Sequence, residues 1–151
     1  MGQEYRKALK LVGQAHQQLL CVIKDELDRR GIRAINNVQA LLLFNFEDEV
    51  LRVSDLRAQG RYAGSNVTYN VRKLVDAGYV QRESSETDGR VVFLKLTPKG
   101  RELAARLGEI FDHHTDRFES IAEVSGDDVA AINAGLIKLD RFWRDQIRFR
   151  L

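Results

Sequence analysis

The sequence of 151 residues holds one cysteine and no long apolar run, and both absences narrow the class of protein. One cysteine cannot form an internal disulfide, which agrees with a reducing compartment. The longest apolar run, Ala40 to Phe44, is far too short to cross a membrane. The chain begins with polar residues and not with an apolar secretory segment, so we expect a cytoplasmic protein without a membrane partner.

Motifs of common enzymes are missing as well. No nucleophile elbow, phosphate-binding loop or dinucleotide fingerprint occurs, and no Ser-His-Asp order stands out. We therefore expect a protein that is not an enzyme and uses no cofactor. With 44% hydrophobic and 30% charged residues, the chain has the composition of a single globular domain that is large enough to bury a core.

Charge is distributed unevenly along the chain. Residues 52–101 hold 10 basic and 5 acidic residues, whereas the remainder holds 14 basic and 17 acidic residues. A basic segment on an acidic frame suits a surface that binds phosphates. Nucleic acid is therefore the expected partner.

A helix, a β-hairpin and a second helix follow one another within residues 65–101. In the first helix Val67, Val71 and Leu74 recur at helical spacing, which predicts one buried face. The opposite face carries hydroxyl, amide and cationic donors, which suit base edges and phosphates in the major groove. An ordinary solvated helix is the alternative. The residues that we expect to contact DNA from this helix are Ser65, Asn66, Thr68, Tyr69, Arg72 and Lys73.

The hairpin favours DNA binding over that alternative. Asp88-Gly89 lies between two strand-like runs, residues 79–84 and 91–97, and predicts a tight turn whose two central residues have positive φ. Arg90 beside the tip could enter the minor groove, because its negative potential attracts a guanidinium. Asp88 could hold Arg90 through a bidentate ion pair. A routine surface hairpin with a weak ion pair is the alternative.

Three motifs in this order resemble the MarR family of bacterial transcriptional regulators. They are the run Leu74 to Val80, the Asp88-x-Arg90 wing, and the run Leu96 to Arg101. The resemblance covers residues 35–107 and implies a recognition helix, a wing, and DNA contacts from Asp88 and Arg90. Many members have Asp-Arg-Arg at the wing tip, where this chain has Asp88-Gly89-Arg90, so each wing lacks one possible DNA contact.

Amphipathic helices flank this segment. We expect a long first helix that ends near Gly31, a second helix capped by Asn37, and a short third helix capped by Ser54. Thr97 begins a long fifth helix, and Ser125 begins the sixth. The predicted fold is mainly α (α+β), with a winged helix-turn-helix region at residues 35–101. Residues 1–34 and 102–151 form a helical dimerisation region.

The flanking helices carry more apolar surface than one winged region can cover, which predicts a twofold homodimer. Such a dimer places two recognition helices about 34 Å apart, so its operator is a palindrome in double-stranded DNA. A monomer whose helices close on themselves is the alternative.

The family resemblance implies a small-molecule effector that binds between the dimer helices and the winged region and modulates a repressor. An effector of this kind must bind one state of the protein better than the other. Such aromatic and apolar stripes also occur in ordinary cores. The residues that we expect to line its pocket are His16, Leu20, Phe44, Phe46 and Phe111.

Three alternatives stay open at this point. Cys21 could be a redox sensor, although its apolar neighbours favour an inert thiol. Residues 112–116 contain two histidines and two aspartates, but His114 is expected to point into the core, so we predict no metal site. The third alternative is a winged-helix module that binds another protein and has no operator. The cationic residues Arg72 and Arg90 argue against it.

Overall fold

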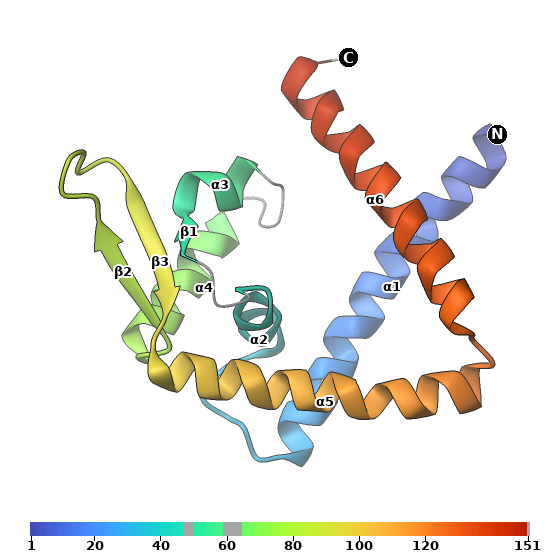
Figure 1. Ribbon diagram of the computed structural model, residues 1–151, viewed down its shortest axis with the longest axis horizontal. Helices are drawn as coiled ribbons and strands as arrows, with labels where there is room; N and C mark the ends of the chain where they lie inside the picture. Colours follow the sequence, from blue (N-terminus) through green and yellow to red (C-terminus); the bar gives the residue numbers. More distant parts are fainter. Residues whose placement is uncertain (47–49, 59–64, 151) are drawn as a thin grey trace.

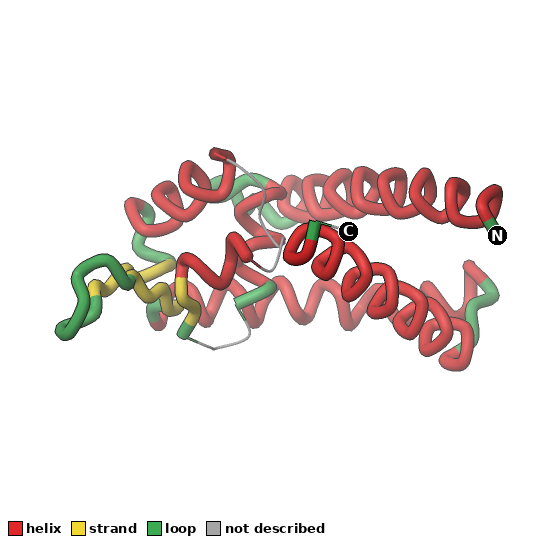
Figure 2. The backbone as a smooth tube through the Cα atoms, turned by 90° about the horizontal axis from the view of Figure 1, so that it is seen from above, coloured by secondary structure: helices red, strands yellow, loops and turns green. Residues whose placement is uncertain are grey.

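The computed structural model describes residues 1–46, 50–58 and 65–150, which form a small winged part and an array of long helices (Figure 1). The winged part contains α2 (Asn37–Phe44), β1 (Leu51–Arg52), α3 (Val53–Ala58), α4 (Ser65–Asp76), β2 (Val80–Ser84) and β3 (Val92–Leu96). The long helices are α1 (Gly2–Arg29), α5 (Pro98–Ala122) and α6 (Gly126–Phe149). Figures 1 and 2 show α5 leading from the wing toward the region where α6 lies near α1.

The three strands form an antiparallel sheet in the order β1-β3-β2. Pairing between the two wing strands runs from Val80 opposite Leu96 to Ser84 opposite Val92. Leu94 and Leu96 are buried, because alternate residues of a strand face the same side. The mainly helical fold with a small wing sheet confirms the predicted fold class.

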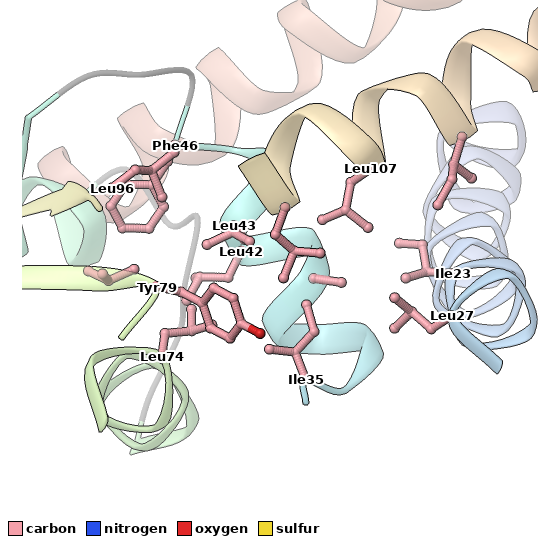
Figure 3. Close-up of a cluster of buried hydrophobic side chains, with 14 of the residues drawn as sticks. Ile23, Leu27, Ile35, Leu42, Leu43, Phe46, Leu74, Tyr79, Leu96 and Leu107 are labelled. Atoms are coloured by element: carbon pink, nitrogen blue, oxygen red, sulfur yellow. The ribbon is translucent and has the colours of Figure 1, made fainter. Parts of the chain in front are cut away.

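The core lies where α2 meets α4, the sheet and α5 (Figure 3). Leu42 and Leu43 of α2 are fully buried, as is Leu74 of α4. This burial confirms the inward face that the spacing of the recognition helix predicts. Ile23 and Leu27 of α1 pack against the same cluster, so only the last turns of α1 contribute to the core.

Local capping pairs set the helix ends. Thr97 and Ser125 cap α5 and α6 as predicted, each accepting a hydrogen bond from the backbone N–H three residues on. The cap predicted for α2 is wrong by one residue: Asn36 caps the helix, because Gln39 completes a reciprocal capping box with it. Asn37 instead donates to the Leu20 carbonyl of α1 at 2.9 Å. The third helix begins at Val53, one residue before its predicted cap Ser54.

The turn predicted at the wing tip is also wrong. Neither Asp88 nor Gly89 has a positive φ angle; among the described residues, positive φ occurs at other positions. β2 ends at Ser84 and β3 begins at Val92, so the connection is longer than a two-residue turn. The tip is a β-turn, in which the Val91 N–H donates a hydrogen bond to the Asp88 carbonyl at 3.0 Å. Asp88 occupies the first position of the turn, where aspartate is common.

The long helices leave much apolar surface exposed. No residue of α6 is buried, although it carries Ile132, Leu136 and Ile147. A hydrogen bond joins α6 to α1, from Trp143 Nε1 to the Tyr5 hydroxyl at 3.1 Å. None of the helices in the described ranges is both long and apolar enough to cross a membrane.

Candidate DNA-binding interface

The exposed face of α4 gathers most of the residues predicted to contact DNA. Asn66, Thr68, Arg72 and Lys73 are exposed, and Tyr69 keeps 57% of its surface accessible. They lie opposite the buried face of the helix, since residues advance by about 100° each. The helix begins at Ser65, whose side chain lies outside the described part of the structure.

The two cations on this face each take part in a weak side-chain interaction. The Lys73 ammonium lies 5.5 Å above the Tyr69 ring, and Arg72 Nε lies 4.0 Å from a carboxylate oxygen of Asp76. Each pair spans one helical turn and both partners are exposed. Exposed pairs of this kind contribute little to stability, so DNA can replace them at small cost.

A buried polar pair, which the sequence pattern did not predict, fixes α4 against α2. Asn70 is only 7% exposed and accepts a hydrogen bond from Gln39 Nε2 at 3.2 Å. Its own amide nitrogen donates to the Asn66 carbonyl at 2.7 Å. Because a buried amide must keep its partners, this pair sets the rotation of α4 and therefore the residues that it exposes. The signal in the sequence was an asparagine within the otherwise apolar face of the helix, which indicates a buried polar contact.

At the wing tip, Asp88 contacts the backbone of Arg90 and not its guanidinium. Asp88 Oδ1 accepts the Arg90 N–H at 3.0 Å. The predicted bidentate pair is therefore wrong, because this carboxylate stabilises the β-turn. Arg90 is exposed at the tip, where a cation can reach a phosphate or a groove.

The predicted effector residues divide into three groups. The Phe44 and Phe111 rings meet edge to face at 4.8 Å, joining α2 to α5. Leu20 is half-buried and His16 is exposed, both on α1. Phe46 is 1% exposed and belongs to the core (Figure 3), so the prediction that it lines the pocket is wrong.

Cys21 and the histidines occupy different surroundings from those expected. The Cys21 thiol is exposed on α1, not enclosed by its apolar neighbours. His114 Nε2 lies 3.3 Å from Glu26 Oε1 across α1 and α5, and His113 Nδ1 lies 2.8 Å from the Glu109 carbonyl. Within the described residues, no three His, Cys, Asp or Glu side chains converge as metal ligands.

Comparison with known sequences matches the winged part. Residues 35–100 fit a family model described as a winged helix DNA-binding domain. The exopolysaccharide II synthesis transcriptional activator ExpG of Rhizobium meliloti (strain 1021) is 31% identical over 103 residues, which make up 68% of this chain and 53% of that protein. The chain spans between 53 and 61% of the length of the curated relatives it matches.

Solved structures share the fold over nearly the whole chain. The transcriptional regulator SlyA aligns with a TM-score of 0.76 at 12% identity, covering 95% of this chain and 99% of that one. Streptococcus pneumoniae FabT, solved in complex with DNA, aligns with a TM-score of 0.62 at 26% identity, covering 93% and 98%. The fold and the family model are those of winged helix-turn-helix regulators and not of enzymes. The winged helix domain at residues 35–100 and the fold shared with solved MarR regulators support the resemblance found in the sequence.

Proposed function

We propose that the protein is a transcriptional regulator, acting as a repressor in the cytoplasm, that binds a palindromic operator in double-stranded DNA as a homodimer. The donor-rich exposed face of α4 carries this proposal, since the buried pair of Asn70 and Gln39 fixes its orientation. The DNA complex of the similar FabT structure supports the same partner.

Residues 1–34 and 102–151 form the dimerisation region of this proposal, and residues 35–101 form the DNA-binding region. The exposed apolar side chains of α1, α5 and α6 support the assignment, because a second copy would remove them from water. The dimer then presents two α4 helices to successive major grooves.

A small-molecule effector completes the proposal. Phe44 and Phe111 form the aromatic contact where α2 meets α5, with Leu20 and His16 on the neighbouring α1. A ligand held there would bias the angle between the winged part and the long helices, if it binds one arrangement better than the other.

Selection of bound sequences from random duplex DNA at two salt concentrations tests the function. We expect a palindrome with half-sites about one helical turn apart, and affinity that falls steeply as salt rises. Binding without sequence preference would contradict an operator. Absence of binding at both salt concentrations would favour a module that recognises another protein.

Arg72→Ala is expected to relax base preference at one position in each half-site. Arg72 is highly exposed on α4, and a guanidinium that contacts a base contributes roughly 1–3 kcal/mol of discrimination. Competition between the operator and single-base variants measures the change, with Arg117→Ala at an exposed position of α5 as a control variant that loses the same charge. Unchanged discrimination in Arg72→Ala would place a different face of α4 in the groove.

Arg90→Ala is expected to weaken binding to all sequences by a similar factor. The wing tip presents one exposed guanidinium, and loss of one phosphate contact lowers the slope of log affinity against log salt by about 1 per wing. Fluorescence anisotropy over a salt series measures this slope. A loss confined to one DNA sequence would show that Arg90 reads bases.

A further inference from the structure

Three consecutive backbone carbonyls follow α4, and the start of α5 binds all of them. The Lys99 ammonium donates to the Ala77 carbonyl at 2.9 Å, and the Thr97 hydroxyl donates to the Gly78 carbonyl at 2.6 Å. The Thr97 N–H donates to the Tyr79 carbonyl at 3.0 Å. We call these three contacts the carbonyl clamp. The two side-chain contacts join residues that are 19 and 22 positions apart, so the clamp is a tertiary feature.

The turn that the carbonyl clamp holds has a fixed backbone path. The chain leaves α4 at Gly78 with φ 79°, where the Tyr79 N–H bonds the Leu74 carbonyl at 2.9 Å and the Gly78 N–H bonds the Val75 carbonyl at 3.0 Å. This pattern is a Schellman end. The last carbonyls of a helix lack partners within it and carry partial negative charge, so a lysine ammonium is favourable there. Lys99 therefore supplies from α5 a cation that suits the end of α4.

Packing around the clamp directs the Lys99 side chain. Its ammonium lies 4.4 Å above the ring of Tyr79, a residue that is only 7% exposed and belongs to the core (Figure 3). A cation over an aromatic face is attracted by the ring, so this contact and the carbonyl favour the same position. Lys99 itself is exposed, so its replacement removes the contact and leaves the core intact.

The carbonyl clamp lies at the root of the wing. Val80 begins β2 and pairs with Leu96 at the end of β3, so the clamp joins α4, both wing strands and α5 at one point (Figure 1). Each wing strand has five residues, a length of about 17 Å. A rotation of about 10° at the root moves the far end of such a strand by about 3 Å, more than a hydrogen bond tolerates. The angle at the root therefore decides where Arg90 at the tip lies when α4 is in place.

We propose that Lys99 is a positioning residue for operator binding, which fixes the angle between α4 and the wing so that both reach one DNA duplex together. Lys99 acts through the Ala77 carbonyl and does not contact DNA. The proposal rests on the proposed DNA-binding function. Two contacts held at a matching angle form without a further cost of ordering. Binding to random DNA depends on phosphate contacts in any register, so it needs this angle less than operator binding does.

Lys99→Met removes the ammonium and keeps most of the side-chain length, so it tests this role in the full chain. Fluorescence anisotropy with the selected operator should show an affinity about fivefold lower, the effect of losing a helix-end cation and a cation–π contact. Affinity for a random duplex should change less than twofold. Lys99→Arg should restore operator affinity, because its guanidinium can donate to the same carbonyl. Lys24→Met, at an exposed position of α1, removes the same charge away from the clamp and should leave operator affinity near that of the native chain.

A double-mutant cycle with Arg90→Ala separates positioning from a general loss of stability. In the native chain the clamp holds the wing tip in place, so Arg90→Ala should cost its full effect on operator affinity. In the Lys99→Met chain the wing can tilt, and the same substitution should cost at least threefold less. A loss of stability alone would lower both affinities by one factor and leave the effect of Arg90→Ala unchanged. Urea unfolding checks that each variant is folded.

Three results would overturn the role of Lys99 and leave the proposed function standing. The first is an operator affinity that Lys99→Met does not change. The second is additivity of Lys99→Met and Arg90→Ala to within about twofold, which would show that the two sites act independently. The third is an equal loss on operator and random duplex with a salt slope lower by about 1, which would make Lys99 a direct phosphate contact. Failure of the native chain to bind any operator would instead contradict the proposed function and this proposal together.

Discussion

Gly100→Ala is expected to lower the free energy of unfolding by about 3 kcal/mol, a large effect for one methyl group. A Cβ at Gly100 would lie 2.0 Å from the Tyr79 carbonyl oxygen, so the backbone of α5 or of the wing must move. That carbonyl accepts the Thr97 N–H at 3.0 Å, and the Thr97 hydroxyl donates to the Gly78 carbonyl at 2.6 Å. Moving the backbone would break the junction that joins the wing to α5.

Gly108→Ala on the same helix is the matched control. A Cβ at Gly108 meets no atom within 4 Å, so alanine should raise stability by about 0.5–1 kcal/mol through its better helix propensity. Urea unfolding at one protein concentration measures both variants, since a dimer's stability depends on concentration. Equal stability of Gly100→Ala and the native chain would show that α5 and the wing are not so closely packed.

Local spacing predicted the helix ends well because each cap contact spans three residues. Thr97 and Ser125 precede their partners by that distance, and both caps were predicted. The α2 cap was placed one residue late, because the adjacent Asn36 and Asn37 are equally good caps until the partner Gln39 is considered. At the wing, Asp88-Gly89 forms part of a longer loop whose length depends on where the strands stop pairing. Sequence spacing alone does not fix that point.

The exposed face of α4 could be predicted because the 3.6-residue period places Arg72 opposite Leu74 without knowledge of the partner elements. The contact between Asn70 and Gln39 could not, because the two residues are separated by 31 positions and meet only when α2 packs on α4. The prediction that Phe46 lines the effector pocket was wrong for a related reason. An aromatic residue at a helix end fits a pocket wall and a core equally well, and only the packing of the sheet decides between them.

Leu136→Glu is expected to convert the proposed dimer into monomers and to lower operator affinity at least 100-fold. Leu136 is 45% exposed in the single chain and lies on the α6 stripe with Ile132 and Trp143. In a dimer this stripe would be buried, and a glutamate there would leave an unpaired charge in an apolar interface in both copies. Two linked half-site contacts bind 10²–10⁴ times more tightly than one, so separating the copies removes that gain.

Light scattering and anisotropy with operator DNA measure the two consequences separately. Ala134→Glu adds the same charge on the opposite side of α6 and should leave both the mass and the affinity near those of the native chain. If the Leu136→Glu monomer still binds a single half-site as well as one native protomer would, then the face of α4 is intact and the loss arises from separation of the copies. A Leu136→Glu protein that remains a dimer with full operator affinity would show that the α6 stripe is not the dimer contact. The apolar side chains of α1 and α5 would then have to supply it.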